Sequence, residues 1–215
     1  MDTYRKLQSY FDQKNIEITE GLFKGTYPLS TFSCGQVLNT DKIDIQGNLI
    51  SVSKGTYDIS VAITESDVFK KFNTEGKVSI AVKLKAKESK DATQAFVDES
   101  ASIRVDGGSL FVGAENSNQK MEEKEDEFFG EDENDMKDFG EELAQGRVKG
   151  VEQGVKNDFA HELIIDDVHA TNIFSGYGDG TYDLWCGADE EGNIVELIID
   201  FKVFERNDVI EKMNS

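Results

Sequence analysis

The sequence predicts an α+β fold, mainly an antiparallel β-sheet or sandwich, with an acidic helical insertion. Segments in which apolar and polar residues alternate recur along most of the chain, and this is the period of a strand with one buried face. Turns rich in glycine and polar residues, such as 188–193, separate these segments. Between 115 and 157 the composition changes, because β-branched residues become scarce and Glu, Lys, Gln and Met dominate.

The length and the charge pattern suggest one domain with a distinct segment inside it. At 215 residues the chain suits a single α+β domain, 1–215, with the acidic helical insertion at 115–157. It has 43 acidic and 23 basic residues, a net charge of −20. Residues 115–142 contain thirteen acids and three lysines, a net charge of −10, so half of the net charge lies in this segment.

This acidity limits the classes of partner. No basic stripe is present that could bind nucleic acid or an anionic membrane surface directly. An acidic surface favours basic protein partners or divalent cations, or it serves solubility alone as a solvated face.

Cysteine usage and hydropathy indicate the compartment. Cys34 and Cys186 lie far apart, and neither has a C-x-x-C or metal-ligand spacing, which suits a reducing compartment. The N-terminus lacks an apolar core of signal-peptide length, and no apolar run approaches the about 18 residues of a membrane helix. We therefore expect a cytoplasmic protein.

Periodicity predicts the elements before the insertion. Tyr4, Leu7, Tyr10 and Phe11 have helical spacing, which predicts an amphipathic helix within 1–14. Pro28, the only proline, is expected at a sheet edge or at the start of a strand. Extended structure is predicted at 15–39, at 40–50 around a turn at 46–48, and at 51–64, 77–87 and 94–105, with one helical turn at 66–72.

The insertion predicts two helices, at 117–129 and 133–146, that break near Gly130 and hold their acids outward. Phe128 and Phe129 are expected to pack rather than stay in water. Disorder is the alternative, because the net charge is high and the hydrophobicity is low.

The end of the chain predicts more strands. Extended structure is expected at 159–174, followed by a hairpin over 180–204 that pairs with the N-terminal strands, and a helical turn at 208–213. The tripeptide Gly-Thr-Tyr occurs at 25–27, 55–57 and 180–182, each time before an alternating run. We interpret it as a device that starts strands, with chance as the alternative in a chain that has 19 glycines.

Two short patterns resemble ligand loops without matching them. Gly176, Gly178 and Gly180 form G-x-G-x-G, but the run precedes a strand, whereas a dinucleotide loop follows one. Asp179 is therefore expected to cap a turn. Residues 131–135 resemble a calcium loop but have Met136 where the sharp turn needs glycine. We expect no metal and no cofactor.

The case for catalysis is thin. His161 and His169 are the only histidines, and no nucleophile motif such as G-x-S-x-G is present. Asp166, Asp167 and His169 on one extended stretch would not all face one metal ion. We assign no catalytic residue and expect a protein that is not an enzyme.

The C-terminal quarter resembles the signature of the bacterial domain-of-unknown-function family 4241, roughly G-D-G-x-Y-P-x-Y-W-G-x-D-x-x-G followed by an apolar strand that ends in Asp-Phe. The matching residues are Gly178, Asp179, Gly180, Tyr182, Gly187, Asp189, Gly192, Asp200 and Phe201. Asp183, Trp185 and Cys186 replace the family's proline, tyrosine and tryptophan. The resemblance supports the architecture and implies no activity. Similar small acidic bacterial proteins are often encoded beside secreted toxins as immunity proteins.

The leading functional hypothesis is a non-enzymatic acidic binding protein, namely an immunity protein or antitoxin that covers a basic surface of a toxin. Its candidate contacts are the acids of the insertion, with the two phenylalanines as anchors if exposed: Glu122, Glu123, Glu125, Asp126, Phe128, Phe129, Glu131, Asp132, Glu133 and Asp135.

Two alternatives stay open. The first is a small-ligand binder or hydrolase-like enzyme that uses the loop from Gly176 to Gly187 with Asp179, His169 and Asp166. The second is a nucleic-acid mimic, whose carboxylates would be spaced like phosphates.

Overall fold

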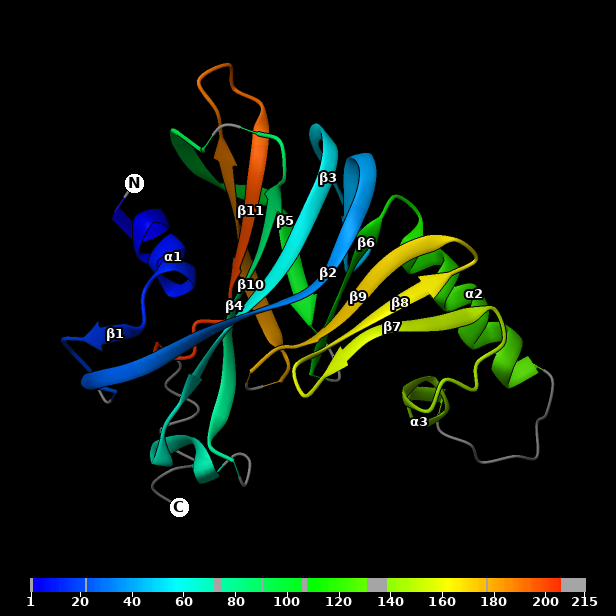
Figure 1. Cartoon of the computed structure of the whole chain (residues 1–215), viewed down its shortest axis with the longest axis horizontal. Helices are drawn as coiled ribbons and strands as arrows, with labels where there is room; N and C mark the ends of the chain where they lie inside the picture. Colours follow the sequence, from blue (N-terminus) through cyan, green and yellow to red (C-terminus); the bar gives the residue numbers. More distant parts are fainter. Residues whose placement is uncertain are drawn as a thin grey trace.

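The computed structural model describes residues 2–21, 23–71, 75–89, 91–105, 108–130, 139–176 and 178–205. In this part of the chain the fold is α+β and mainly an antiparallel β-sheet, as predicted (Figure 1). The helices are α1 (Asp2–Asp12), α2 (Ser117–Gly130) and α3 (Phe139–Ala144), with a 3-10 turn, η1 (Asp67–Lys71). The strands are β1 (Asn15–Ile18), β2 (Gly25–Ile45), β3 (Asn48–Glu65), β4 (Lys77–Ala86), β5 (Gln94–Val105), β6 (Ser109–Ala114), β7 (Val151–Asn157), β8 (Ala160–Ile165), β9 (Val168–Phe174), β10 (Gly180–Ala188) and β11 (Ile194–Asp200).

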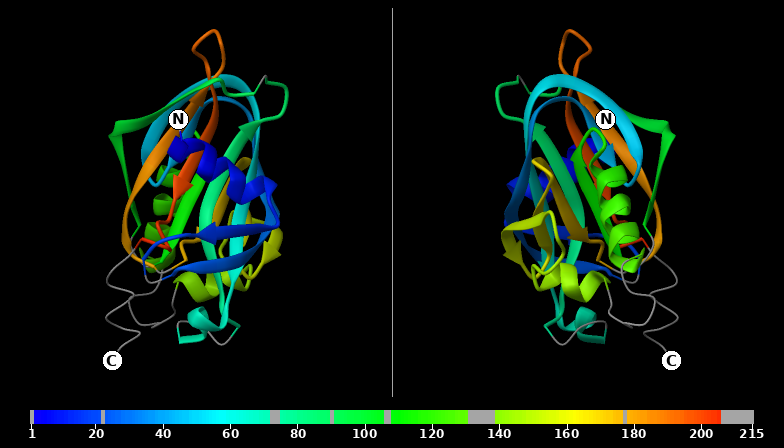
Figure 2. Two further views of the ribbon diagram at one scale, coloured as in Figure 1. Left: turned by 90° about the vertical axis from the view of Figure 1, so that its left-hand side faces the viewer. Right: turned by 90° about the vertical axis from the view of Figure 1, so that its right-hand side faces the viewer.

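The described strands form one curved sheet in the order β5-β10-β11-β4-β3-β2-β6-β9-β8-β7, with β1 paired to the start of β2 (Figure 2). The hairpin β10–β11 pairs with β5 on one side and β4 on the other, which confirms that it joins the N-terminal strands. The central strand β11 is buried on both faces, which explains its continuous apolar sequence.

Strand β2 links two halves of the sheet. From Leu29 onward it pairs with β3, and its last residues, Ile43 to Ile45, also pair with β6. The β2–β3 turn has positive φ at both Gln46 and Gly47, the geometry of a two-residue hairpin turn that matches strand twist. Strands β6, β9, β8 and β7 continue from this junction, and we call them the wing.

The wing is a middle layer between β2 and the helices of the insertion. On one face, Leu110, Ile173 and their neighbours belong to the main core, which also contains α1 and the other half of the sheet. On the opposite face, Phe111, Leu163 and Ile165 join Phe139, Val148, Val151 and Ala170 in a second core, against which Met121, Phe128 and Leu143 pack. The alternation of side chains along each strand produces this division.

The contact between β2 and the wing requires a glycine. At Gly35 the backbone has φ +154°, and a Cβ there would collide with the hydroxyl of Thr171 on β9. A side chain at this position would push the two layers apart.

Several element boundaries differ from the sequence predictions. Residues 151–157, included in the helical insertion, form strand β7, because Val151 is buried in the second core. The second helix is confined to α3 within the described residues, and 131–138 lie outside them. The predicted helical turn at 208–213 also lies outside the described residues.

The Gly-Thr-Tyr copies are only partly strand starts. Gly25 and Gly180 begin β2 and β10, but Gly55 lies inside β3, where its pairing with β2 shifts register. What the copies share is the tyrosine, since Tyr27, Tyr57 and Tyr182 are all buried in the main core. Pro28 is not at the start of a strand: it is the fourth residue of β2 and pairs with Asn15 of β1, one residue before β2 begins to pair with β3.

Helix α1 is fastened to the sheet by a buried polar contact. The Tyr4 hydroxyl donates to Oε1 of Glu196 on β11 at 2.6 Å, and Gln8 Nε2 donates to the same oxygen at 3.0 Å. Burial and then the Glu196 carboxylate raise the pKa of Tyr4 above its usual range, so this hydroxyl stays a donor. Gly187 on β10 leaves the space that the Tyr4 hydroxyl occupies.

We predict that Gly187→Ala lowers the free energy of unfolding by about 2–4 kcal/mol, because the new Cβ displaces Tyr4 and removes one of the two donors to the buried Glu196 carboxylate. Gly55→Ala is the matched control, since its Cβ would meet nothing within 4 Å. It should change stability by less than about 0.5 kcal/mol in the same chemical denaturation experiment. Equal effects of the two substitutions would contradict this packing argument.

Candidate functional site

Helix α2 has an inward and an outward face of different chemistry. Ser117, Met121, Lys124 and Phe128 are buried or half-buried, and their spacing of four, three and four places them on one face. The opposite face exposes the carboxylates of the insertion that the sequence singles out: Glu122, Glu123, Glu125 and Asp126. Glu127 and Phe129 are exposed beside them. We call these six residues the outer face of α2.

The start of α2 is fixed by the β2–β3 hairpin and by a glycine on β6. Asp44 Oδ2 accepts the backbone N–H of Asn118 at 3.1 Å, and its Oδ1 accepts that of Gly47 at 2.9 Å. A carboxylate at this position also complements the helix dipole. Burial raises the pKa of Asp44 above its usual range despite these two N–H donors. A Cβ at Gly113 would lie 2.6 Å from that of Ser117, so glycine permits the close approach.

The two lysines of α2 face the body of the protein. Lys124 Nζ lies 3.1 Å from Asp166 Oδ2 and 3.3 Å from Glu127 Oε2, and its side chain is only 13% exposed. Lys120 Nζ donates to the Asp166 carbonyl at 3.1 Å. The pKa of Lys124 is raised, first by its hydrogen bond to Asp166. The helix thus directs its positive charge to the β8–β9 turn and its negative charge to solvent.

An aromatic group closes the far end of α2. The rings of Phe128 and Phe139 meet edge to face with centroids 5.5 Å apart, and Phe129 lies 5.3 Å from Phe128 and 6.4 Å from Phe139. Phe139 is buried and Phe128 half-buried, whereas Phe129 is 50% exposed. The expectation that both phenylalanines pack away from water is therefore wrong for Phe129.

The outer face contains five of the candidate contact residues, and Phe128 packs inward. The remaining four, Glu131, Asp132, Glu133 and Asp135, lie outside the described residues.

The glycine-rich loop after β9 is held by hydrogen bonds and close packing. Asp179 Oδ1 accepts the Gly108 N–H at 2.9 Å, as expected for a residue that caps a turn. The hydroxyls of Ser175 and Tyr182 both donate to the Gly178 carbonyl, at 2.8 and 2.9 Å. Gly176 has φ +60°, and a Cβ there would collide with the Ser79 carbonyl.

The residues of the alternative ligand site do not converge. Asp166 lies in the turn before β9 and Asp179 in the loop after it, so the length of the strand separates them. His169 lies on the wing face toward β2, with Nδ1 buried and 3.7 Å from Glu162 Oε1.

Thiol chemistry is also unfavourable. Cys34 and Cys186 are both free and fully buried. Burial, with a smaller contribution from the Glu162 charge, raises the pKa of Cys34 to about 12, and burial raises that of Cys186 to about 12. Neither thiol is a thiolate near neutral pH, which a nucleophile requires.

Among the described residues, no group of three or more His, Cys, Asp and Glu side chains is arranged to hold a metal ion. In the same residues, no helix has the length and apolar character needed to cross a membrane.

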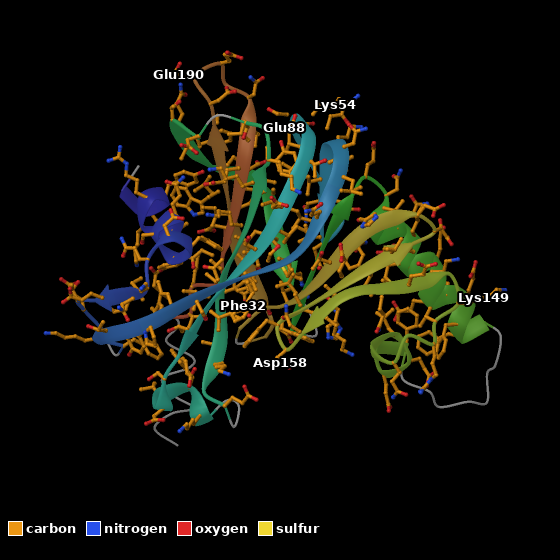
Figure 3. The ribbon with its side chains drawn as sticks, in the orientation of Figure 1. Phe32, Lys54, Glu88, Lys149, Asp158 and Glu190 are labelled. Atoms are coloured by element: carbon orange, nitrogen blue, oxygen red, sulfur yellow. The ribbon has the colours of Figure 1, made fainter. Side chains whose placement is uncertain are left out.

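Several cavities open on the surface. A cavity of about 780 Å³ lies beside Lys54, Glu88 and Asp189 at the end of the sheet marked by Lys54 and Glu88 in Figure 3. A smaller one, of about 250 Å³, lies between β2 and the β7–β8 turn, with Phe32, Asp158 and Phe159 in its wall. None of the residues 176–187 lines either cavity.

Sequence reasoning missed the residues that orient α2 and those of the smaller cavity. The one signal in the sequence is the polar pair Asp166-Asp167 between two alternating runs, since such a pair favours a tight turn. In the structure both residues have positive φ. Asp44, Gly113 and Lys124 orient α2 through contacts with residues that are distant in the sequence. No local sequence pattern predicts these contacts.

The signature residue Asp200 gives a pH-dependent prediction. It is 8% exposed, and burial raises its pKa to about 6, although the Lys202 N–H donates to it at 2.9 Å. Because the folded pKa exceeds the unfolded value of 3.8, the native state binds the proton more tightly, and this stabilisation is lost as pH rises through about 6.

We expect Asp200→Asn to remove that loss, so the stability of the variant relative to the parent should rise by about 3 kcal/mol between pH 3.5 and pH 7. Urea denaturation at both pH values measures this. A difference that does not change with pH would contradict the assignment.

Comparison with known proteins shows the family of the chain. A family model described as "Protein of unknown function (DUF4241)" matches residues 31–199. This span runs from β2 into β11 and includes the whole wing and α2. The comparisons with curated proteins and with solved structures gave no match. The resemblance inferred from the C-terminal signature is confirmed, and the chain belongs to this family of proteins of unknown function, DUF4241.

Proposed function

We propose that this protein is a bacterial immunity protein: a non-enzymatic, acidic, cytoplasmic inhibitor that covers a basic surface of a toxin. The observation that carries the proposal is the charge separation across α2, in which Lys120 and Lys124 are turned to the Asp166 turn while the outer face presents carboxylates. The net charge of −20 extends the same field over the molecule.

The orientation of α2 supports this role because it is fixed before any partner binds. Asp44, Gly113 and the Lys124–Asp166 ion pair hold the helix on the wing, so its carboxylates need little ordering on binding. Complementary charge would speed association and select against acidic partners. Phe129 provides exposed aromatic area within the same face, where it can be buried as an anchor.

The first prediction concerns the charge of the outer face. We expect the protein to bind and neutralise the toxin encoded beside its own gene. The combined change Glu122→Gln, Glu123→Gln, Glu125→Gln and Asp126→Asn should weaken binding about 10- to 100-fold, mainly through slower association. Salt should then affect the association rate less than in the parent. Surface plasmon resonance at two ionic strengths measures both.

The matched control removes four exposed acids that lie away from α2: Glu17, Glu20, Glu88 and Glu190. Changing these four to Gln reduces the net negative charge by the same amount as the outer-face variant does. It should weaken binding much less if direct contacts, and not the overall field, decide affinity. Equal losses in the two variants would refute the outer face as the binding surface. If the captured partner were instead a DNA-binding protein released from DNA, the nucleic-acid-mimic alternative would replace this proposal.

The second prediction separates the two phenylalanines. Phe129→Ala should weaken toxin binding by about 10-fold or more with little loss of stability, because Phe129 is 50% exposed. Phe128→Ala should instead lower the free energy of unfolding by about 2–4 kcal/mol, because Phe128 packs on Phe139 in the second core. Thermal denaturation and binding are measured on both variants. Unchanged affinity of Phe129→Ala would remove it as an anchor.

A further inference from the structure

The cavity beside Phe32 lies at the other end of the wing from the Asp166 turn on which α2 rests. In Figure 3, Phe32 on β2 and Asp158 in the β7–β8 turn are labelled near the centre of the view, whereas α2 runs along its right-hand side. The cavity is formed where that turn meets one face of the β2–β3–β4 sheet. We call it the β7–β8 cavity. Its wall consists of Ser30, Phe32, Ile63, Glu65, Lys77, Asn157, Asp158 and Phe159.

The cavity contains an unusual amount of exposed aromatic surface. Phe32 is 43% exposed, although Val61, its pairing partner on β3, is fully buried. Its ring stacks on that of Phe159, with centroids 6.2 Å apart and planes inclined by 27°. The turn that carries Phe159 is rigid, because Asn157 Oδ1 accepts the N–H groups of both Phe159 and Ala160 at 2.9 Å.

The rim of the cavity is acidic. Glu65 and Asp158 are exposed at its edge, and Glu75 lies beside it, 3.2 Å from the Lys77 ammonium. The pKa of Lys77 is raised, first by the hydrogen bond to Glu75, then by the charges of Glu75, Glu65 and Asp158. The wall of the cavity therefore carries two carboxylates, Glu65 and Asp158, and one lysine, Lys77, which is itself paired with Glu75.

The size and chemistry of the cavity select its occupant. A volume of about 250 Å³ is below the usual range for a small-molecule pocket and suits one long side chain. An aromatic face with carboxylates at its edge attracts a flat cation, because the ring quadrupole and the carboxylates act on the same charge. A guanidinium group meets both requirements, since it stacks on rings and donates in a plane to carboxylates.

We propose that the β7–β8 cavity binds a guanidinium group, presented as an arginine side chain by a basic partner protein. The guanidinium plane lies on the Phe32 ring, and its N–H groups donate to Asp158 and Glu65 at the rim. The identity of the partner rests on the proposed function, whereas the affinity of the cavity for guanidinium does not. The protein would then hold a basic partner at two separate places, the outer face of α2 and this cavity.

The test uses small probes with the full chain. Acetyl-arginine amide, its neutral isostere acetyl-citrulline amide and acetyl-leucine amide are titrated while backbone amide shifts are followed by NMR. We expect the arginine probe to perturb residues 30–32, 63–65 and 157–160, and to bind about 3- to 30-fold more tightly than citrulline. Equal perturbation by citrulline or leucine would overturn the proposal and mark an apolar or uncharged site.

Variants assign the effect to the cavity. Phe32→Leu and Asp158→Asn should each lower the affinity for the arginine probe about 3-fold. Both positions are exposed, so the fold should tolerate the changes. The controls are Phe96→Leu, at a phenylalanine 47% exposed on β5, and Glu190→Gln in the β10–β11 turn. The controls should leave the affinity unchanged, and losses equal to those of the cavity variants would overturn the proposal.

The outcomes separate this inference from the proposed function. If the arginine probe binds at the cavity but the outer-face variants of α2 retain full toxin binding, the proposed binding surface fails and the cavity assignment stands. If the outer-face variants lose toxin binding while the arginine probe leaves residues 30–32 and 157–160 unperturbed, the reverse holds.

Discussion

The architecture depends on the path of β2, which passes from the main sheet to the wing within a single strand. Three residues, Ile43 to Ile45, pair with β6 and carry the sheet across the junction, while Gly35 lets β2 lie directly on Thr171 of β9. Because the wing is thereby held face-on to β2, its opposite face is free to carry the second core and α2. Both surfaces proposed to contact a partner follow from this layering, since one lies outside the wing and the other lies between its β7–β8 turn and β2.

The helix of the insertion shows how an acidic segment remains folded. Among its exposed carboxylates, Glu127 pairs with Lys124, and the others face solvent. The compensating charges are placed on the inner side, where Lys124 is largely removed from water and paired with Asp166, so that the ion pair is screened less than a surface pair would be. Met121 and Phe128 supply the apolar area that the helix needs, and Asp44 satisfies an N–H at its start. A helix with a high net charge can therefore fold when one side chain in each turn packs against the core.

Local sequence patterns predict the strands and fail at contacts between distant segments. The alternation at 51–64, 77–87 and 94–105 and the helical spacing from Tyr4 to Phe11 are visible within each element, and the structure has β3, β4, β5 and α1 there. The boundary at Val151 was missed because burial in the second core, not its own composition, makes that segment a strand. For the same reason the acids of the candidate site could be named, whereas the inward orientation of Lys124 and the pairing of Phe32 with Phe159 could not.

The two buried thiols have a practical consequence. Cys34 lies next to Gly35, where β2 meets the wing, and Cys186 lies in β10 of the main sheet. Both are inaccessible and protonated in the native state, so a thiol reagent can modify either one only during an opening event that exposes it. Because both cysteines lie in the main core, the labelling rate of each reports an opening of that core around its own strand, β2 for Cys34 and β10 for Cys186.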